Sequence, residues 1–188
     1  MKKTLLVSSL LTSSLLSVSA LAATTVPGGT INFVGTVVDT ACAVQAGQGG
    51  TNSTVDMGQI TLRSFKDPAD KTKFVANQLA GAPQQFNIVL ADCDTSTQKN
   101  AAITFKGVAA SGNSKVLAAG SGAGSAQGIG LQIFDSAGTA IDLGSASPAM
   151  VLNDGENNMA FSADYISTSV TPKAGQANAT ATFTVTYS

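Results

Sequence analysis

The chain of 188 residues has no histidine and no tryptophan, and only 11% of its residues are charged. Without histidine, neither a serine–histidine–aspartate nor a cysteine–histidine nucleophile can be assembled. Without tryptophan and with only two tyrosines, the sequence lacks the aromatic platform expected beside sugar-cleaving carboxylates. We therefore expect no enzyme activity, no metal site and no bound cofactor.

The acidic residues are dispersed and suggest no catalytic pair. Asp92 and Asp94 lie closest together, but they flank Cys93, and a solvated strand end is the simpler interpretation. Asp154 and Glu156 have asparagine neighbours, yet they miss the ligand spacing of a helix–loop–helix calcium site.

The first residues resemble a secretory signal rather than a part of the fold. Lys2 and Lys3 precede an apolar run rich in leucine and serine, and a small-residue pattern, Ala-Leu-Ala, ends at Ala22. This pattern predicts a cleaved signal peptide over residues 1–22. A membrane anchor is disfavoured because the run is short and broken by serines. The mature chain would begin at Ala23.

The mature chain is mildly acidic and sized for one domain. Removing 22 residues from 188 leaves 166, with eight basic and eleven acidic residues and a formal charge of −3. Its charges are scattered, so nucleic acid is not an expected partner.

Two cysteines, Cys42 and Cys93, remain after cleavage. An even number of cysteines in an exported chain favours one disulfide. In the disputed chain-entropy model, closing so long a loop stabilises the fold by ~4 kcal/mol.

Alternating apolar residues mark a strand near each end of the mature chain. In the stretch 30–39, one face carries Ile31, Phe33, Gly35 and Val37. In the stretch 180–188, one face carries Ala181, Phe183, Val185 and Tyr187. A two-residue period of this kind is typical of a half-buried strand. We expect the last strand to have no further element covering it, and the first to complete a neighbouring subunit's sheet.

Several shorter stretches between these two ends predict strands or loops. Alternation predicts strands over 54–60, 84–90, 101–105, 129–134 and 159–166, and a turn at 135–138 predicts a hairpin. The Ala-, Gly- and Ser-rich stretch 109–128 predicts a surface loop. Many short strands without helical period indicate an all-β sandwich. An ordinary, complete secreted sandwich would show the same pattern, so the pattern alone leaves both interpretations open.

Longer blocks of the sequence resemble a known family. The N-terminal block ATTVPGGTINFVGTVVDTACAV, the internal blocks VDMGQI, FNIVLADCD, GLQIFD and FSADY, and the C-terminal block ANATATFTVTY are similar to the major subunits of type 1-like fimbriae. These are pilins of the chaperone–usher class. The similarity spans essentially the whole mature chain.

The resemblance implies an incomplete immunoglobulin-like sandwich that lacks its final strand. A donor strand from a neighbouring subunit would complete it. Residues 23–38 would be the N-terminal donor-strand extension and 39–188 the pilin domain. The groove-facing donor residues would be Ile31, Phe33, Gly35 and Val37, and the wall of the acceptor groove, which also meets the chaperone, would be Ala181, Phe183, Val185 and Tyr187. Cys42 and Cys93 would form the sandwich disulfide.

The resemblance also implies partners, location and role. A periplasmic chaperone would lend a strand first, and an outer-membrane usher would exchange it for the extension of an identical or related pilin subunit. The product is a surface fimbria that supports cell adhesion. A minor adaptor pilin and a glycan-binding adhesin module are the alternatives, although a two-domain adhesin needs a receptor domain for which the mature chain has no room.

Overall fold

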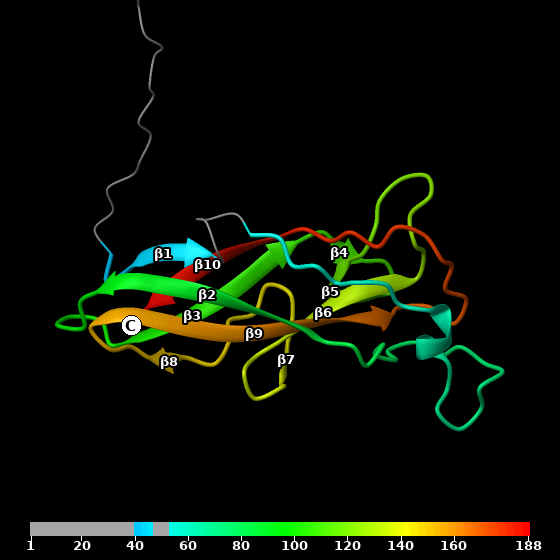
Figure 1. Ribbon diagram of the computed structural model, residues 1–188, viewed down its shortest axis with the longest axis horizontal. Coiled ribbons are helices and arrows are strands. Elements are labelled where there is room, and N and C mark those ends of the chain that lie inside the picture. Colours follow the sequence, from blue (N-terminus) through cyan, green and yellow to red (C-terminus); the bar gives the residue numbers. More distant parts are fainter. Residues whose placement is uncertain (1–39, 47–52) are drawn as a thin grey trace, which may run out of the picture. The chain divides into compact units, whose positions relative to one another are not determined.

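The computed structural model describes residues 40–46 and 53–188, and Figure 1 shows them as strands joined by loops. The strands are β1 (Ala43–Ala46), β2 (Gln84–Cys93), β3 (Asn100–Gly107), β4 (Ala109–Ala110), β5 (Asn113–Ala118), β6 (Ile129–Phe134), β7 (Ala140–Ile141), β8 (Met150–Val151), β9 (Gly155–Ser167) and β10 (Ala181–Tyr187). A single short 3-10 helix, Leu62–Phe65, is the only helix in this part of the chain. None of the described residues forms a helix long and apolar enough to cross a membrane.

The strands form two sheets. The larger has the order β1-β2-β9-β6-β5-β4, with β7 paired to β6, and the smaller has the order β10-β3-β8. All of these strand pairs are antiparallel. The expected all-β sandwich is confirmed, and β1 and β10 each stand at the end of a sheet among the described residues.

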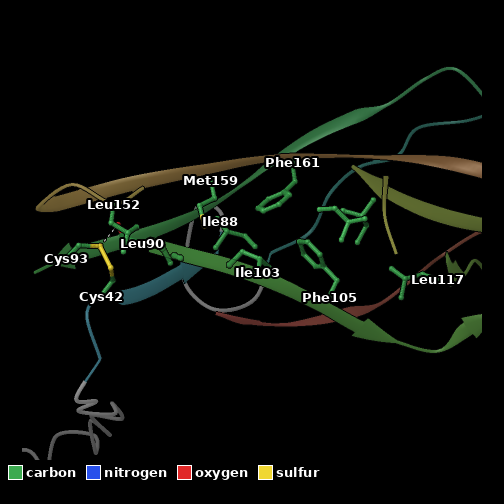
Figure 2. Packing of buried hydrophobic residues seen from close by; sticks show 13 residues of the cluster. Cys42, Ile88, Leu90, Cys93, Ile103, Phe105, Leu117, Leu152, Met159 and Phe161 are labelled. Carbon is green, nitrogen blue, oxygen red and sulfur yellow. Dashed lines mark hydrogen bonds between the residues drawn. A yellow bond between two sulfur atoms is a disulfide. The ribbon is translucent and has the colours of Figure 1, made fainter. Parts of the chain in front are cut away.

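The core lies between the two sheets and follows the alternation of the strands (Figure 2). Apolar residues of β2 and β9 face each other in register, as in the pairs Phe86–Phe161 and Ile88–Met159. Phe105 of β3 meets Phe161 edge-on, with ring centroids 5.2 Å apart. Such aromatic contacts add to the apolar burial that drives folding.

The hairpin between β6 and β7 is confirmed, and its turn chemistry is local. The carboxylate of Asp135 accepts hydrogen bonds from the backbone N–H groups of Ala137 and Thr139, at 2.9 and 2.8 Å. Gly138 has a φ of 78°, in the region where a side chain is disfavoured. The sequence Asp-Ser-Ala-Gly therefore fixes the reversal.

Two local predictions are wrong. Residues 54–60 form no strand, and Met57 and Ile60 instead pack beside a second core cluster that contains Phe65 and Tyr165. The stretch 109–128 is not simply a loop, because it contains β4 and β5. Here tertiary pairing outweighs a composition that is poor in β-formers.

Candidate functional site

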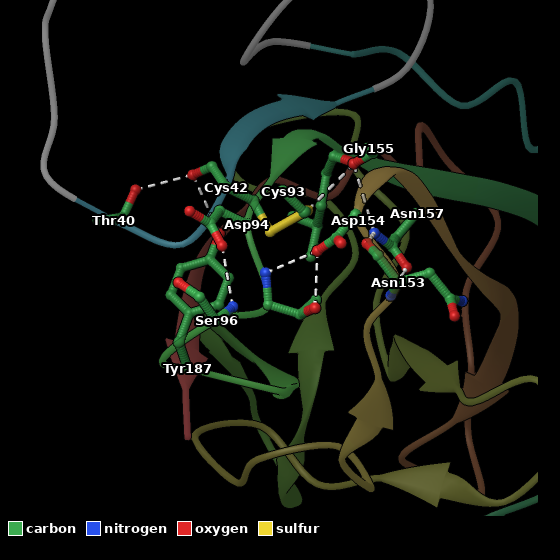
Figure 3. Close-up of a disulfide and its surroundings, with 12 residues drawn as sticks. Thr40, Cys42, Cys93, Asp94, Ser96, Asn153, Asp154, Gly155, Asn157 and Tyr187 are labelled. Carbon is green, nitrogen blue, oxygen red and sulfur yellow. Dashed lines mark hydrogen bonds between the residues drawn. A yellow bond between two sulfur atoms is a disulfide. The ribbon is translucent and has the colours of Figure 1, made fainter.

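The disulfide ties the beginning of β1 to the end of β2 (Figure 3). Cys42 and Cys93 are bonded and lie 51 positions apart in the sequence, with their Cα atoms 4.1 Å apart. Asp94 N–H donates to the carbonyl of Ala41 at 2.9 Å and continues the same connection. The expected disulfide is confirmed. It attaches β1, the strand at one border of the large sheet, covalently to its neighbour β2.

The end of β10 reaches this border. The hydroxyl of Tyr187 donates to the carbonyl of Cys42 at 3.4 Å, and the hydroxyl of Thr40 donates to the same carbonyl at 2.7 Å. Partial burial raises the pKa of the Tyr187 phenol, so it remains a hydrogen-bond donor throughout the neutral range. β1 and β10, from different sheets, are thus joined at one end.

Side chains on the inner face of β10 are less covered than their direct partners on β3. Phe183 lies opposite Phe105 and Val185 opposite Ile103 in the antiparallel register. Phe105 is 4% exposed and Ile103 0% exposed, whereas both partners on β10 are only half-buried. The core is closed under β3 and partly open under β10.

The backbone of β10 is open along the same side. Ser188 and Asn100 exchange hydrogen bonds, with N–O distances of 3.0 and 2.8 Å. In an antiparallel pair, hydrogen-bonded positions alternate along the strand. The backbone N–H and C=O groups of the threonines at 182, 184 and 186 therefore point toward β3. Phe183, Val185 and Tyr187 therefore turn their N–H and C=O groups away from β3. Within residues 40–46 and 53–188, no strand pairs with that side.

The facing border on the large sheet shows the same contrast. Val44 of β1 lies opposite Leu90, which is 0% exposed, while Val44 itself is half-buried. Phe86 of β2 is also half-buried, and its ring centroid lies 6.1 Å from that of Phe105. We call this region the open edge: the unpaired side of β10 with Phe183, Val185 and Tyr187, together with Phe86 and Val44.

The site residues expected from the sequence divide into three groups. Phe183, Val185 and Tyr187 lie at the open edge, while Ala181, at the start of β10, is exposed. The expected donor residues Ile31, Phe33, Gly35 and Val37 lie outside the described residues. Sequence reasoning missed Phe86 and Val44, because alternation marks an inner face and says nothing about how well it is covered.

The rest of the described surface offers few groups that could bind a metal ion or carry out catalysis. In the two described ranges, no group of three His, Cys, Asp or Glu residues is placed to hold a metal ion. A hollow of about 590 Å³ lies beside β4 and the start of β6, and uncharged, mostly small residues line it, including Ala110, Gly128 and Thr168. No titratable side chain is among the residues that line it. The open edge is therefore the feature that distinguishes this part of the molecule.

Comparison with known proteins identifies the family of this chain. Residues 31–188 match the family described as fimbrial protein. The chain belongs to the fimbrial protein family. It is 44% identical to the type-1 fimbrial protein A chain of Escherichia coli K12 over an alignment of 171 positions, and the match covers 88% of this chain and 87% of that relative.

Solved structures of fimbrial proteins share the fold. A Burkholderia pseudomallei antigen and type I fimbria protein is 36% identical, with a TM-score of 0.56, covering 85% of this chain and 97% of that one. A chain from a chaperone–usher pilus is 26% identical, with a TM-score of 0.63, covering 88% of this chain and 100% of that one. The sandwich is thus of the immunoglobulin-like kind found in pilus subunits.

Proposed function

We propose that this chain is a structural subunit of a surface fimbria and that it polymerises by donor-strand exchange. The open edge of one subunit accepts residues 23–38 of the next. Residues 39–188 form the pilin domain that provides the edge. Residues 1–22 are the cleaved signal peptide that directs the chain to the periplasm.

The observation that carries this proposal is the contrast between β10 and β3. Partners in direct register differ in burial, and the less buried residues also carry the unpaired backbone groups. A long unpaired edge normally invites association with another strand. One added strand would satisfy both deficits at once, by pairing with β10 and covering its apolar residues.

The proposed donor has the pattern that this edge requires. Ile31, Phe33 and Val37 share one strand face and would cover Phe86, Phe183 and the valines. Gly35, on the same face, would fit where the core leaves little depth. Because the donor and the acceptor are different surfaces of the subunit, the contact is heterologous and repeats without closing, which produces a filament.

The same edge needs protection before assembly. Exposed apolar side chains and unpaired backbone groups make the free subunit prone to aggregate. A periplasmic chaperone that lends a strand would cover the edge, and an outer-membrane usher would exchange that strand for the next subunit's extension. The related subunits are therefore the final partners, and the cell surface is the final location.

A pair of substitutions in the proposed donor tests this function. Phe33→Asp places a charge on the face that enters the core, whereas Asn32→Asp places the same charge on the opposite face. We expect Phe33→Asp to abolish filaments in electron micrographs and the ladder of multimers on an unboiled denaturing gel. Asn32→Asp should retain both. Normal filaments from Phe33→Asp, or from a chain lacking residues 23–38, would contradict the proposal.

A further inference from the structure

Charged side chains of opposite sign gather at opposite ends of β9. The segment 63–73 packs at the C-terminal end, where the Ser167 hydroxyl donates to the Val75 carbonyl at 2.5 Å and Val75 N–H donates to Phe65 at 3.3 Å. We call this the basic end; its cations are Arg63, Lys66, Lys71, Lys73 and, in the loop after β9, Lys173.

The acidic end lies where β9 begins and β2 ends. Thr95 N–H donates to the carboxylate of Asp154 at 2.9 Å and so joins the two loops. The exposed carboxylates here are Asp92, Asp94, Asp154 and Glu156. β9 has 13 residues, so the two ends are separated by roughly 40 Å. In Figure 1, β9 begins at the left of the view and ends at the right, beside the teal segment.

Each end keeps an excess of one sign of charge, although the basic end also contains carboxylates. At the basic end, Asp70 pairs with Lys73 at 3.0 Å, and Asp56 and Asp67 are also nearby. The buried carboxylate of Asp164, on β9, accepts hydrogen bonds from the N–H groups of Gly81 and Ala82. Arg63 and Lys71 are exposed and have no salt bridge within the described residues. The four carboxylates at the acidic end likewise have none in this part of the chain, and Lys99 is the basic residue nearest to them in sequence.

The chain's connections relate these ends to the open edge. The proposed extension precedes Thr40, which bonds to Cys42 at the acidic end. The opposite end of β10 follows Ala177, whose carbonyl accepts a hydrogen bond from the Tyr165 hydroxyl at 2.7 Å, next to the basic end. An extension inserted along β10 therefore brings its own acidic end against one end of the accepting subunit.

We propose that the acidic end of one subunit docks against the basic end of the next. The partner of this charged surface is a second copy of this chain, and the inference rests on the function proposed above. An extension that ran parallel to β10 would bring the acidic ends of the two subunits together, and repulsion disfavours that orientation. Charge complementarity of this kind chiefly raises the rate of productive encounter and makes that rate depend on salt.

Single charge reversals and their combination test the interface. Lys71→Glu at the basic end and Glu156→Lys at the acidic end each place like charges in contact, and neither side chain makes an internal hydrogen bond or salt bridge among the described residues. Lys106→Glu is the matched control, because this exposed lysine lies on β3 and belongs to neither of the two charged groups. Assembly of the purified mature chain is followed by light scattering at low and at high salt.

We expect each reversal to slow assembly about tenfold at low salt, and the combination of both to recover most of the wild-type rate. Lys106→Glu should assemble like the wild type, and high salt should bring all variants to similar rates. Wild-type rates for both single variants, or an additive loss in the double variant, would overturn the interface while leaving strand exchange intact. Loss of all polymer, as expected for Phe33→Asp alone, would mark failure of the donor strand; a wild-type chain that never polymerises would overturn both proposals.

Discussion

The two strands that flank β3, β8 and β10, differ in length and in the residues that surround them. On one flank, Ser147 N–H donates to the carbonyl of Ile103 at 2.7 Å, its hydroxyl accepts the Ile103 N–H at 3.0 Å, and Gly144 N–H donates to Phe105 at 2.8 Å. The strand that follows, β8, has two residues and comes after Pro148. On the other flank, β10 has seven residues and contains no proline or charged residue.

The difference shows that the β8 side of the small sheet is protected against pairing with another strand, whereas β10 is not. Short strands, prolines and charges are the usual means by which proteins prevent edge-to-edge association. The flank at β8 uses two of them, whereas β10 uses none and leaves apolar side chains half-buried. An unprotected edge of this length is understandable when pairing with another strand is its function.

The largest expected effect on stability comes from substituting two phenylalanines that lie opposite each other on β3 and β10. Phe105→Ala should lower the free energy of unfolding by about 3–5 kcal/mol, because it opens a cavity in a closed core. Phe183→Ala should cost about half as much in a chain lacking residues 23–38, because its ring is already partly exposed. Urea unfolding measures both costs.

Adding a peptide of residues 23–38 sharpens the same experiment. The peptide should raise the cost of Phe183→Ala toward that of Phe105→Ala, since the covered ring then lies in a closed core. Equal costs before the peptide is added would show that the core is as closed under β10 as under β3, contrary to our account.

A smaller effect is expected on the protected flank. Ser147→Ala leaves the buried N–H of Ile103 without its acceptor and should cost about 1–3 kcal/mol in the free energy of unfolding. Ser145→Ala is the control, because that side chain is exposed, and it should change stability by less than about 0.5 kcal/mol. A Ser147→Ala variant as stable as its control would show that this flank does not depend on the serine.

The smallest effect concerns acid. A hydrogen bond from the Ser96 N–H lowers the pKa of Asp94, and one from the Thr95 hydroxyl lowers the pKa of Asp154, both from a usual value of 3.8. Because the folded-state pKa is the lower one, these carboxylates stabilise the fold above pH 3.8 and lose that contribution as pH falls through the folded value. Asp154→Asn should therefore make the midpoint of urea unfolding less sensitive to pH below about 4. An unchanged acid dependence would contradict this assignment.

Much of the sandwich could be predicted from local pattern. Alternation located β2, β6 and β10 because each has one face in the core, and the Asp-Ser-Ala-Gly turn located the β6–β7 hairpin. The pairing of Cys42 with Cys93 followed from their even number in a chain that the sequence predicts to be exported. These features depend on residues close in sequence or on simple counts.

The rest depends on contacts between distant segments. Residues 54–60 alternate like a strand, yet their apolar side chains pack beside Phe65 without a strand partner among the described residues. β5 lies in a stretch rich in Ala, Gly and Ser and forms because β4 and β6 pair with it. The contribution of Val44 and Phe86 to the open edge likewise required the register between strands, which no single stretch encodes.

Hydrogen exchange along β10 measures whether one side of this strand is unpaired in the single subunit and paired in the filament. In a chain lacking residues 23–38, the amides of Phe183 and Val185 should exchange quickly, while those of Thr184 and Thr186, which face β3, should be protected. In the assembled filament all four should be protected, because an added strand pairs with the open side. Protection of Phe183 and Val185 in the truncated chain, or their rapid exchange in the filament, would contradict the account.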